Sequence, residues 1–404
     1  MQMIDFQDIE HANGVLEEVV KHTSLKKSKT FSEMSNANVF LKMENLQLTG
    51  SFKIRGAYNK IYHLSNEEKK KGVVCSSAGN HAQGVALAST LLDVKSKVFM
   101  PIFAPPTKIL ATRGYGAEVM LKGSTYDEAF IAAKSYSETN KVPFVHAFND
   151  RFVIAGQGTI GMEIHQDLPE VDAVIVPIGG GGLISGISLA LKHLNSNVKI
   201  IGVEAQGACA MQKSVKVKKI IPMRGMNTIA DGIAVKTPGD ITFPLIQQHV
   251  DSIVTVTDNE IAQTMYHLLQ RAKLVVEPAG AVSLAALLHN KVSFPEKNVV
   301  CLLSGGNVNL SLLNQVIEQG MIQNHLIAKI SIIAPDKPKT LKDIISVLSS
   351  INANVQQIIQ DRSAPSIPVG HVKITIMFHI LGKDQMDIII KELEKKGLSC
   401  ECCY

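Results

Sequence analysis

The 404-residue sequence lacks a long uninterrupted apolar run, although 46% of its residues are hydrophobic. Its most apolar region, residues 171–191, is broken by Pro177 and by four consecutive glycines, so a membrane-spanning helix is not expected. Residues 1–10 carry acidic side chains and no apolar core, which is unlike a signal peptide. We therefore expect a cytoplasmic protein that does not associate with membranes.

The sequence also lacks a strong excess of charge of one sign. Its 41 lysine and arginine residues are nearly balanced by 36 aspartate and glutamate residues, for a formal net charge of +5. No basic stripe is interleaved with aromatic residues, so nucleic acid is not an expected partner.

Cysteines are few. Cys75, Cys209 and Cys301 are dispersed through apolar or loop segments, which favours buried thiols in a reducing compartment. The other three form a C-x-C-C pattern near the C-terminus, without histidine or cysteine partners at metal-binding spacing. No metal site is therefore predicted.

The chain is long for one hydrophobic core, which favours two or three domains. Strand-like and helix-like segments alternate over residues 49–148 and again over 149–323, and this alternation predicts an α/β fold with parallel sheets. The strand candidates are 39–43, 73–76, 97–101, 117–121, 144–147, 173–176, 200–204, 252–256 and 299–303; the helix candidates are 80–92, 106–113, 125–139 and 184–194.

After residue 323 the pattern changes. Strand-like alternation and helix-like spacing follow one another in the order β-α-β-β-α-β, which is typical of a ferredoxin-like unit. The sequence thus predicts a separate C-terminal domain over residues 324–404.

Lys53 lies in the stretch G-S-F-K-I-R-G, beside Phe52 and between two glycines. In a closed and partly apolar pocket a lysine loses its charge more easily, and its neutral amine forms a Schiff base with an aldehyde cofactor. The alternative is a solvated lysine at the start of a helix, which these seven residues alone would favour.

Three further stretches follow strand candidates. The segment S-S-A-G-N-H-A-Q-G at 76–84 leaves free backbone N–H groups at the start of a helix, which suit a carboxylate, although Ser77 and Asn80 could instead only cap that helix. Four glycines followed by Leu183 suit one phosphate, and the spaced dinucleotide pattern is absent. Ser304, in the sequence S-G-G-N, ends the last of these strands and could hydrogen-bond a heterocyclic nitrogen.

Together these stretches resemble the fold type II pyridoxal-phosphate enzymes, and most closely the threonine dehydratases (threonine ammonia-lyases). The elements S-F-K-I-R-G, S-A-G-N-H-A-Q-G, G-G-G-G-L and S-G-G-N occur in the order of that family, and the resemblance covers roughly residues 5–320. It implies a two-domain core like the tryptophan synthase β-subunit. The large domain would comprise 1–48 and 149–323, the small domain 49–148, and pyridoxal 5'-phosphate would bind between them.

The resemblance also implies roles for individual residues. Lys53 would carry the cofactor and take the substrate α-proton, Phe52 would line the ring, Asn80 would bond the ring 3-oxygen, and Ser304 would face the ring nitrogen. Gly179, Gly180, Gly181, Gly182 and Leu183 would hold the phosphate. The substrate carboxylate would bind at Ser77, Ala78, Gly79, Asn80 and His81.

The implied reaction is loss of water and ammonia from L-threonine to give 2-oxobutanoate, with L-serine giving pyruvate. A serine-preferring dehydratase or racemase and a non-catalytic amino-acid sensor are the alternatives. Ala78 stands where racemases of this fold have a serine that serves the opposite face of the α-carbon, which favours dehydration. Glu204 and Ala208 match the racemase metal pattern, but Ala210 replaces an expected aspartate ligand.

The C-terminal pattern resembles an ACT-type regulatory domain. A unit this small has few residues for a core and its sheet leaves one face needing cover, so we expect it to pair with the same unit of another subunit, in a dimer or tetramer. The effectors in the dehydratases it resembles are isoleucine and valine, or a nucleotide such as AMP. The usual D-x-P-G turn appears here as Asp336 to Lys339, and Lys339 replaces the glycine that lets a ligand approach the backbone. This departure counts against the usual amino-acid site.

Overall fold

A computed structural model describes residues 4–403, which form two compact units. The division falls between Asn309 and Leu310, ahead of the predicted boundary at residue 323. The difference arises because helix α14 (Leu310–Gln323) contacts the first strand of the second unit. No helix among the described residues is long and apolar enough to cross a membrane.

A six-stranded sheet forms the centre of the first unit, with the strand order β1-β2-β9-β6-β7-β8. Only β1 runs antiparallel to its neighbour, so the other strands end at one common edge. The strands are β1 (Leu25–Lys27), β2 (Asn38–Lys42), β6 (Ala173–Pro177), β7 (Lys199–Ala205), β8 (Ser252–Val256) and β9 (Asn298–Leu302).

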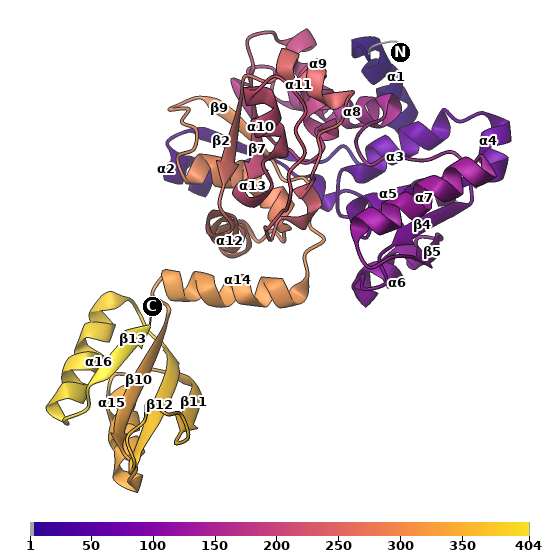
Figure 1. Cartoon of the computed structure of the whole chain (residues 1–404). Helices are drawn as coiled ribbons and strands as arrows, with labels where there is room; N and C mark the ends of the chain where they lie inside the picture. The colour runs from indigo at the N-terminus through magenta and orange to yellow at the C-terminus, as the bar shows by residue number, and fades with distance from the viewer. Residues whose placement is uncertain (1–3, 404) are drawn as a thin grey trace. The chain divides into compact units, whose positions relative to one another are not determined.

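A second sheet in the first unit is parallel and has three strands, β3 (Val73–Ser76), β4 (Ser96–Met100) and β5 (Glu118–Leu121). With its helices it lies beside the six-stranded sheet (Figure 1). The predicted α/β class with parallel sheets is thereby confirmed. The helices of the first unit are α1 (Phe6–Leu16), α2 (Lys29–Ser35), α3 (Lys53–Tyr62), α4 (Asn66–Lys71), α5 (Asn80–Leu91), α6 (Pro106–Gly114), α7 (Tyr126–Asn140), α8 (Arg151–Asp167), α9 (Gly182–Leu194), α10 (Ala210–Lys216), α11 (Thr242–His249), α12 (Asp258–His267) and α13 (Pro278–Leu288).

Helices cover both faces of the six-stranded sheet. Strand β6 is buried along its whole length, as expected for a central parallel strand between two helical layers. Val174 and Val176 share a hydrophobic cluster with residues of α8, α9 and α11, while α13 contacts the same strand together with β7, β8 and β9. This layered packing fixes the strand ends at which the candidate loops begin.

The strand predicted at residues 144–147 is wrong. Phe144 makes only an isolated bridge to Val74, and Val145 donates its N–H to the Val74 carbonyl at 2.8 Å. The chain then turns, because the N–H groups of Phe148 and Asn149 both bond to the His146 Nδ1 atom. The carbonyl of Ala147 therefore faces Lys53 and not a neighbouring strand.

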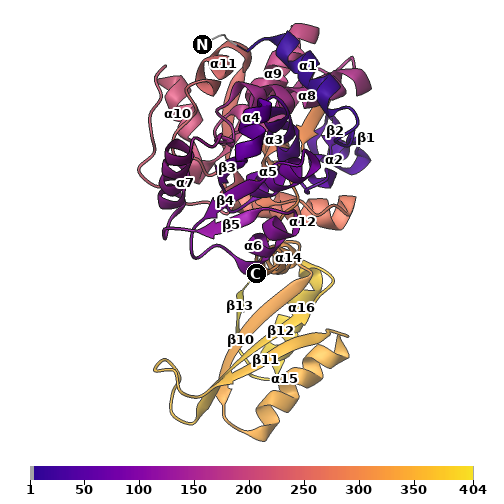
Figure 2. The same ribbon diagram turned by 90° about the vertical axis from the view of Figure 1, so that its right-hand side faces the viewer.

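The second unit has one antiparallel sheet with the strand order β11-β12-β10-β13. Its elements occur in the predicted order β-α-β-β-α-β, and two helices cover one face of the sheet (Figure 2). After α14, the elements of this unit are β10 (Ile327–Pro335), α15 (Pro338–Ser350), β11 (Val355–Asp361), β12 (His371–His379), α16 (Lys383–Lys395) and β13 (Cys400–Cys403). Alternate residues of β12 are buried, because one face packs against the helices and the other does not.

Candidate active site

Lys53 is the first residue of α3, and the loop before it is tied to the S-G-G-N segment. Ser51 forms a bridge with Gly305, and the Phe52 N–H donates to the Ser304 carbonyl at 3.2 Å. Lys53 Nζ donates to the Ala147 carbonyl at 2.9 Å and lies 5.1 Å from the centroid of the Phe52 ring. Residues 51–53 therefore contact two segments that lie far away in the sequence, one around Ala147 and one around Ser304.

The surroundings of Lys53 make its amine easier to deprotonate than that of an exposed lysine. Burial lowers its pKa to about 8, while the charge of Glu277 acts in the opposite direction. His81, on α5, adds no competing positive charge near neutral pH, because burial and the Lys53 charge lower the His81 pKa to about 3. The His81 ring Nε2 lies 2.9 Å from the Val145 carbonyl, which holds the ring in place.

Asn80, the first residue of α5, is held from two sides. Its Nδ2 donates to Glu277 Oε1 at 2.6 Å, and its Oδ1 accepts from Asn307 Nδ2 at 2.7 Å. Asn307 Nδ2 also donates to the Thr49 carbonyl at 2.8 Å. The loop after β3, the S-G-G-N segment and the residue before α13 therefore converge on one amide.

The rest of the loop after β3 forms a tight turn. Ser77 Oγ accepts from the Gly79 N–H at 3.1 Å, so this hydroxyl supports the turn. Ala78 is partly buried and packs against a hydrophobic cluster. Because α5 begins directly afterwards, its first backbone N–H groups have no partner within the helix. The loop therefore offers donors to an anion.

The glycine run lies between β6 and α9. Gly181 has a φ angle of 96°, in the left-handed region that favours glycine. A Cβ atom on Gly180 would lie 2.3 Å from the ring of Phe148, and one on Gly182 would lie 2.7 Å from the Phe148 carbonyl. The backbone thus packs closely against residue 148 at the positive end of a helix.

Ser304 follows β9 and is 3% exposed. Its hydroxyl has a long contact of 3.5 Å to the Ala279 carbonyl, while its own carbonyl binds the Phe52 N–H. A weak hydroxyl contact leaves Ser304 able to serve a second partner.

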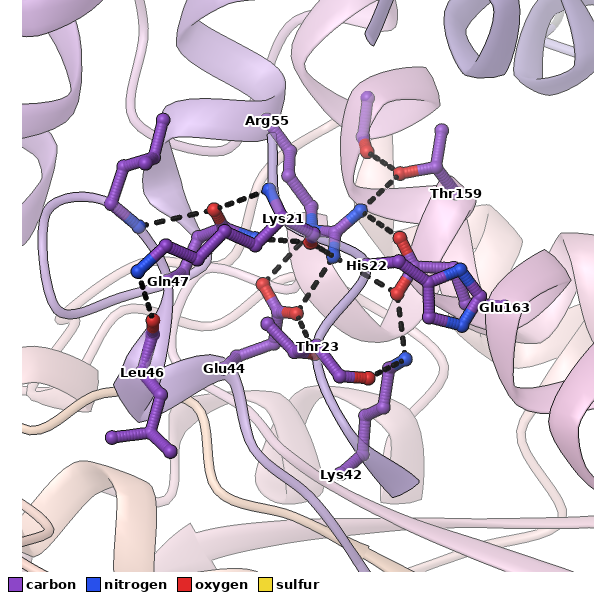
Figure 3. Close-up of polar contacts among 12 residues, drawn as sticks. Lys21, His22, Thr23, Lys42, Glu44, Leu46, Gln47, Arg55, Thr159 and Glu163 are labelled. Carbon is purple, nitrogen blue, oxygen red and sulfur yellow. Dashed lines mark hydrogen bonds and ion pairs between the residues drawn. The ribbon is translucent and has the colours of Figure 1, made fainter. Parts of the chain in front are cut away.

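Arg55, two residues after Lys53, is the centre of a buried charge network (Figure 3). Its guanidinium binds both carboxylate oxygens of Glu44, at 2.9 and 2.7 Å, and both of Glu163, at 2.6 and 3.1 Å. Lys42 Nζ adds a 2.6 Å contact to Glu163. The network thus ties α3 to β2, to the segment after it and to α8.

Comparison with known proteins places this chain in a family. The model of the family described as "Pyridoxal-phosphate dependent enzyme" matches residues 16–305. The chain belongs to this family.

Individual relatives of this family extend the comparison. L-threonine ammonia-lyase of Thermotoga maritima is 46% identical over 98% of both chains. The catabolic L-threonine dehydratase TdcB of Staphylococcus aureus is also 46% identical, over 79% of this chain and 93% of its own length. The solved structure of maize serine racemase superposes with a TM-score of 0.75 and 35% identity, covering 80% of this chain and all of the maize chain.

The residues of the site fit the cofactor of the family. The donor set matches its groups, since the aldehyde needs a neutral amine, the phosphate needs converging N–H groups at a helix N-terminus, and the ring nitrogen accepts a hydrogen bond. Lys53, the Gly179–Leu183 loop and Ser304 offer these donors in that order. Glycine is needed at 180 and 182 because a Cβ there would meet Phe148, and this close packing fixes the backbone of the loop in front of α9.

Sequence reasoning missed Glu277 and Phe148. Glu277 is 6% exposed, and burial together with the charge of Asp231 raises its pKa to about 7. Its signal in the sequence is a single acidic residue at the end of the apolar run L-V-V, directly before a proline that starts a helix. Phe148 has no comparable signal, because its contact with the glycine run depends on tertiary packing alone.

Glu204, which matches part of a racemase metal pattern, binds backbone here. Its carboxylate accepts the N–H groups of Met211 and Gln212 at 2.9 and 2.7 Å, at the start of α10. Burial nevertheless raises the Glu204 pKa to about 7. Among residues 4–401, whose side chains the structure describes, no group of three or more His, Cys, Asp or Glu is arranged to hold a metal ion.

Proposed function

We propose that this protein is an L-threonine ammonia-lyase, which converts L-threonine to 2-oxobutanoate and ammonia and also acts on L-serine to give pyruvate. The observation that carries the proposal is Lys53, whose amine has a lowered pKa and lies where the S-G-G-N segment meets the loop before α3. The near full-length similarity to the Thermotoga maritima L-threonine ammonia-lyase supports the choice of substrate.

The residue roles proposed for the cofactor are those expected from the sequence. Lys53 would bind the cofactor aldehyde, Gly179–Leu183 would hold its phosphate, Asn80 would donate to the ring 3-oxygen, Ser304 would face the ring nitrogen and Phe52 would line the ring. When bound, pyridoxal phosphate acts as an electron sink that makes the α-proton of an attached amino acid acidic. The neutral Ser304 hydroxyl would donate to an unprotonated ring nitrogen, which would suit prompt loss of a β-hydroxyl.

Lys53 is also the proposed base for the α-proton. With a pKa of about 8, roughly a tenth of the free amine is neutral near pH 7 and about half near pH 8. The carboxylate of the substrate binds the N–H groups of the 77–81 loop, where the start of α5 adds partial positive charge. His81 stays neutral there and orients the loop without attracting the proton.

The test is replacement of Lys53 by alanine. The variant should remain folded, lose the visible absorption band of the Schiff base and lose turnover by orders of magnitude, because one residue is both anchor and base. Release of 2-oxobutanoate and pyruvate from L-threonine and L-serine is measured for both proteins. Near wild-type activity in the variant would overturn the proposal.

A serine racemase is the second candidate, and the similarity to the maize enzyme favours it. It requires a proton donor on the far face of the α-carbon, and the residue after Ser77 here is Ala78, which has no hydroxyl. Chiral analysis of the products from L-serine separates the two functions, because a racemase accumulates D-serine.

The domain roles are also proposals. Residues 1–48 and 149–309 form the large catalytic domain and 49–148 the small one. The ACT-like regulatory part, predicted from the sequence as 324–404, is taken together with α14 as 310–404, and it binds an amino acid or AMP. The Staphylococcus aureus relative supports a separable regulatory part, since its match covers 93% of its own length but only 79% of this chain. Assay of the chain with and without residues 310–404, with isoleucine, valine or AMP, tests this role.

We also propose that the protein is a homo-oligomer, either a dimer or a tetramer, and that it is located in the cytoplasm. One face of the C-terminal sheet carries exposed apolar residues, including Ile333 and Ile359, which a second copy would cover. The free, buried thiols of Cys75 and Cys301 support a reducing compartment. Sedimentation of the intact protein measures the oligomeric state directly.

A further inference from the structure

We propose that Glu277 is a positioning residue that fixes the amide of Asn80 and thereby aims one Asn80 N–H at the cofactor. This inference deepens the proposed function and rests on the role given there to Asn80. It concerns cofactor binding, which can be measured without turnover.

Hydrogen-bond accounting at Asn80 carries the argument. Its amide has two N–H donors, and one is taken by Glu277 Oε1 at 2.6 Å. Its oxygen already accepts from Asn307, whose own orientation is set by the Thr49 carbonyl. A reversed amide would bring the Asn80 NH₂ against the NH₂ of Asn307 and, above about pH 7 where Glu277 is ionised, the Asn80 oxygen against the Glu277 carboxylate. One orientation therefore remains, with a single N–H left for the ring oxygen.

The position of Glu277 is itself tightly defined. The Glu277 N–H donates to the Gly305 carbonyl at 3.0 Å, and a Cβ on Gly305 would lie only 2.2 Å from Glu277 Oε1. The S-G-G-N segment therefore needs glycine at residue 305 because the carboxylate occupies that space. Glu277 is thus built into the site, between Gly305 on one side and Asn80 on the other.

Charged groups from several elements face Glu277. Burial raises the Glu277 pKa most, and the charge of Asp231 raises it further. The hydrogen bond from Asn80 and the charges of Lys108 and Lys53 lower it. Because the folded pKa of about 7 lies above the ordinary value of 4.5, the buried carboxyl costs stability, and this cost develops as the pH rises from about 4.5 to about 7 and is complete above 7. A gain in stability therefore does not account for the 2.6 Å contact between Glu277 and Asn80.

The test uses the full-length protein and the affinity of the cofactor-free form for pyridoxal phosphate. Glu277→Met removes the acceptor at similar volume, and we expect the dissociation constant to rise about 10- to 100-fold, as for loss of an outer partner of a ligating group. Glu277→Gln keeps an acceptor oxygen and should restore affinity to within about 3-fold of wild type. Glu260→Met, which removes a carboxylate bound to Lys291 and Thr257, serves as the matched control.

A double-mutant cycle with Asn80→Ala shows whether Glu277 acts through Asn80. If it does, adding Glu277→Met to the Asn80→Ala variant causes no further loss of cofactor affinity. The Asn80→Ala variant and the Asn80→Ala/Glu277→Met double variant then have the same affinity and absorption spectrum. Additive losses, or a Glu277→Met variant that binds as wild type does, would overturn the inference. Misfolding is not expected, because Glu277→Met removes a buried carboxyl that destabilises the fold above pH 7, and thermal unfolding near pH 8 checks this.

The two proposals fail in different ways. Wild-type protein that binds the cofactor but releases no ammonia from L-threonine contradicts the proposed function, while the affinity cycle still decides the role of Glu277. Normal ammonia release with no effect of Glu277→Met on affinity contradicts only the present inference.

Discussion

Replacing Arg55 by leucine should destabilise the first unit strongly. Arg55 and Glu44 are both fully buried, and Arg55 supplies two charged contacts to Glu44 and two to Glu163. Without Arg55, Glu163 keeps Lys42 at 2.6 Å, whereas Glu44 loses both guanidinium hydrogen bonds and keeps the hydroxyl of Thr23 at 2.6 Å and the influence of the Lys42 charge. Breaking a buried ion pair from one side costs about 3–5 kcal/mol, because the remaining charge is left uncompensated.

The pH dependence of this loss follows from Glu44. Burial opposes ionisation of Glu44, but the charge and hydrogen bonds of Arg55 outweigh it and lower the Glu44 pKa below its ordinary value. A lowered pKa in the folded state adds stability that is present at neutral pH and is lost as the pH falls through the folded pKa. The difference between wild type and Arg55→Leu should therefore be largest near pH 8 and should shrink in acid.

Urea unfolding followed by circular dichroism, at about pH 8 and about pH 5, measures both effects. The double variant Arg55→Leu/Glu44→Gln removes the stranded charge and should recover about 2 kcal/mol of the loss near pH 8. A cost below about 1 kcal/mol for Arg55→Leu would refute the reasoning. So would a double variant no more stable than the single one, because the stranded Glu44 charge would then not be the cause.

Two further predictions concern the site. Gly180→Ala should weaken pyridoxal phosphate binding, because its Cβ would lie 2.3 Å from the Phe148 ring. Gly14→Ala is the control, because its Cβ would have no atom within 4 Å and the substitution should add about 0.5–1 kcal/mol of stability. Equal cofactor binding by both variants would contradict the phosphate-binding role of the glycine run. Ala78→Ser should raise D-serine formation relative to pyruvate by supplying a hydroxyl on the far face, and chiral chromatography without detectable D-serine would show that this hydroxyl is insufficient.

The sequence predicted the elements with strong local signals. The strand at 73–76 and the helix at 80–92 agree with β3 and α5, because an apolar run followed by a turn and a helical pattern is a local property. The residues 144–147 look equally strand-like, but Pro143 and the His146 turn leave only a bridge to Val74. Whether residues 144–147 pair as a strand depends on tertiary contacts, which include the bond from Lys53 to the Ala147 carbonyl. The periodicity of the sequence does not contain this information.

The candidate site shows the same division between local and tertiary signals. Lys53, Asn80, the glycine run and Ser304 stand in stretches whose chemistry is readable from neighbouring residues. Glu277 is not, because its role depends on Asn80, which lies far away in the sequence. Likewise, the start of the second unit at Leu310 could not be read from composition, since α14 has an ordinary amphipathic sequence.

Helix geometry explains why Lys53 and Arg55 occur two residues apart. Residues two positions apart on an α-helix point about 200° away from each other, so one side chain faces the site while the other faces the opposite side. Lys53 accordingly reaches the Ala147 carbonyl, and Arg55 enters the charge network of Glu44 and Glu163. A Cβ on Gly56 would lie 2.7 Å from the Val153 carbonyl of α8, so glycine lets the two helices pack this closely. The stretch K-I-R-G thus joins a reactive amine to the contacts that hold its helix in place.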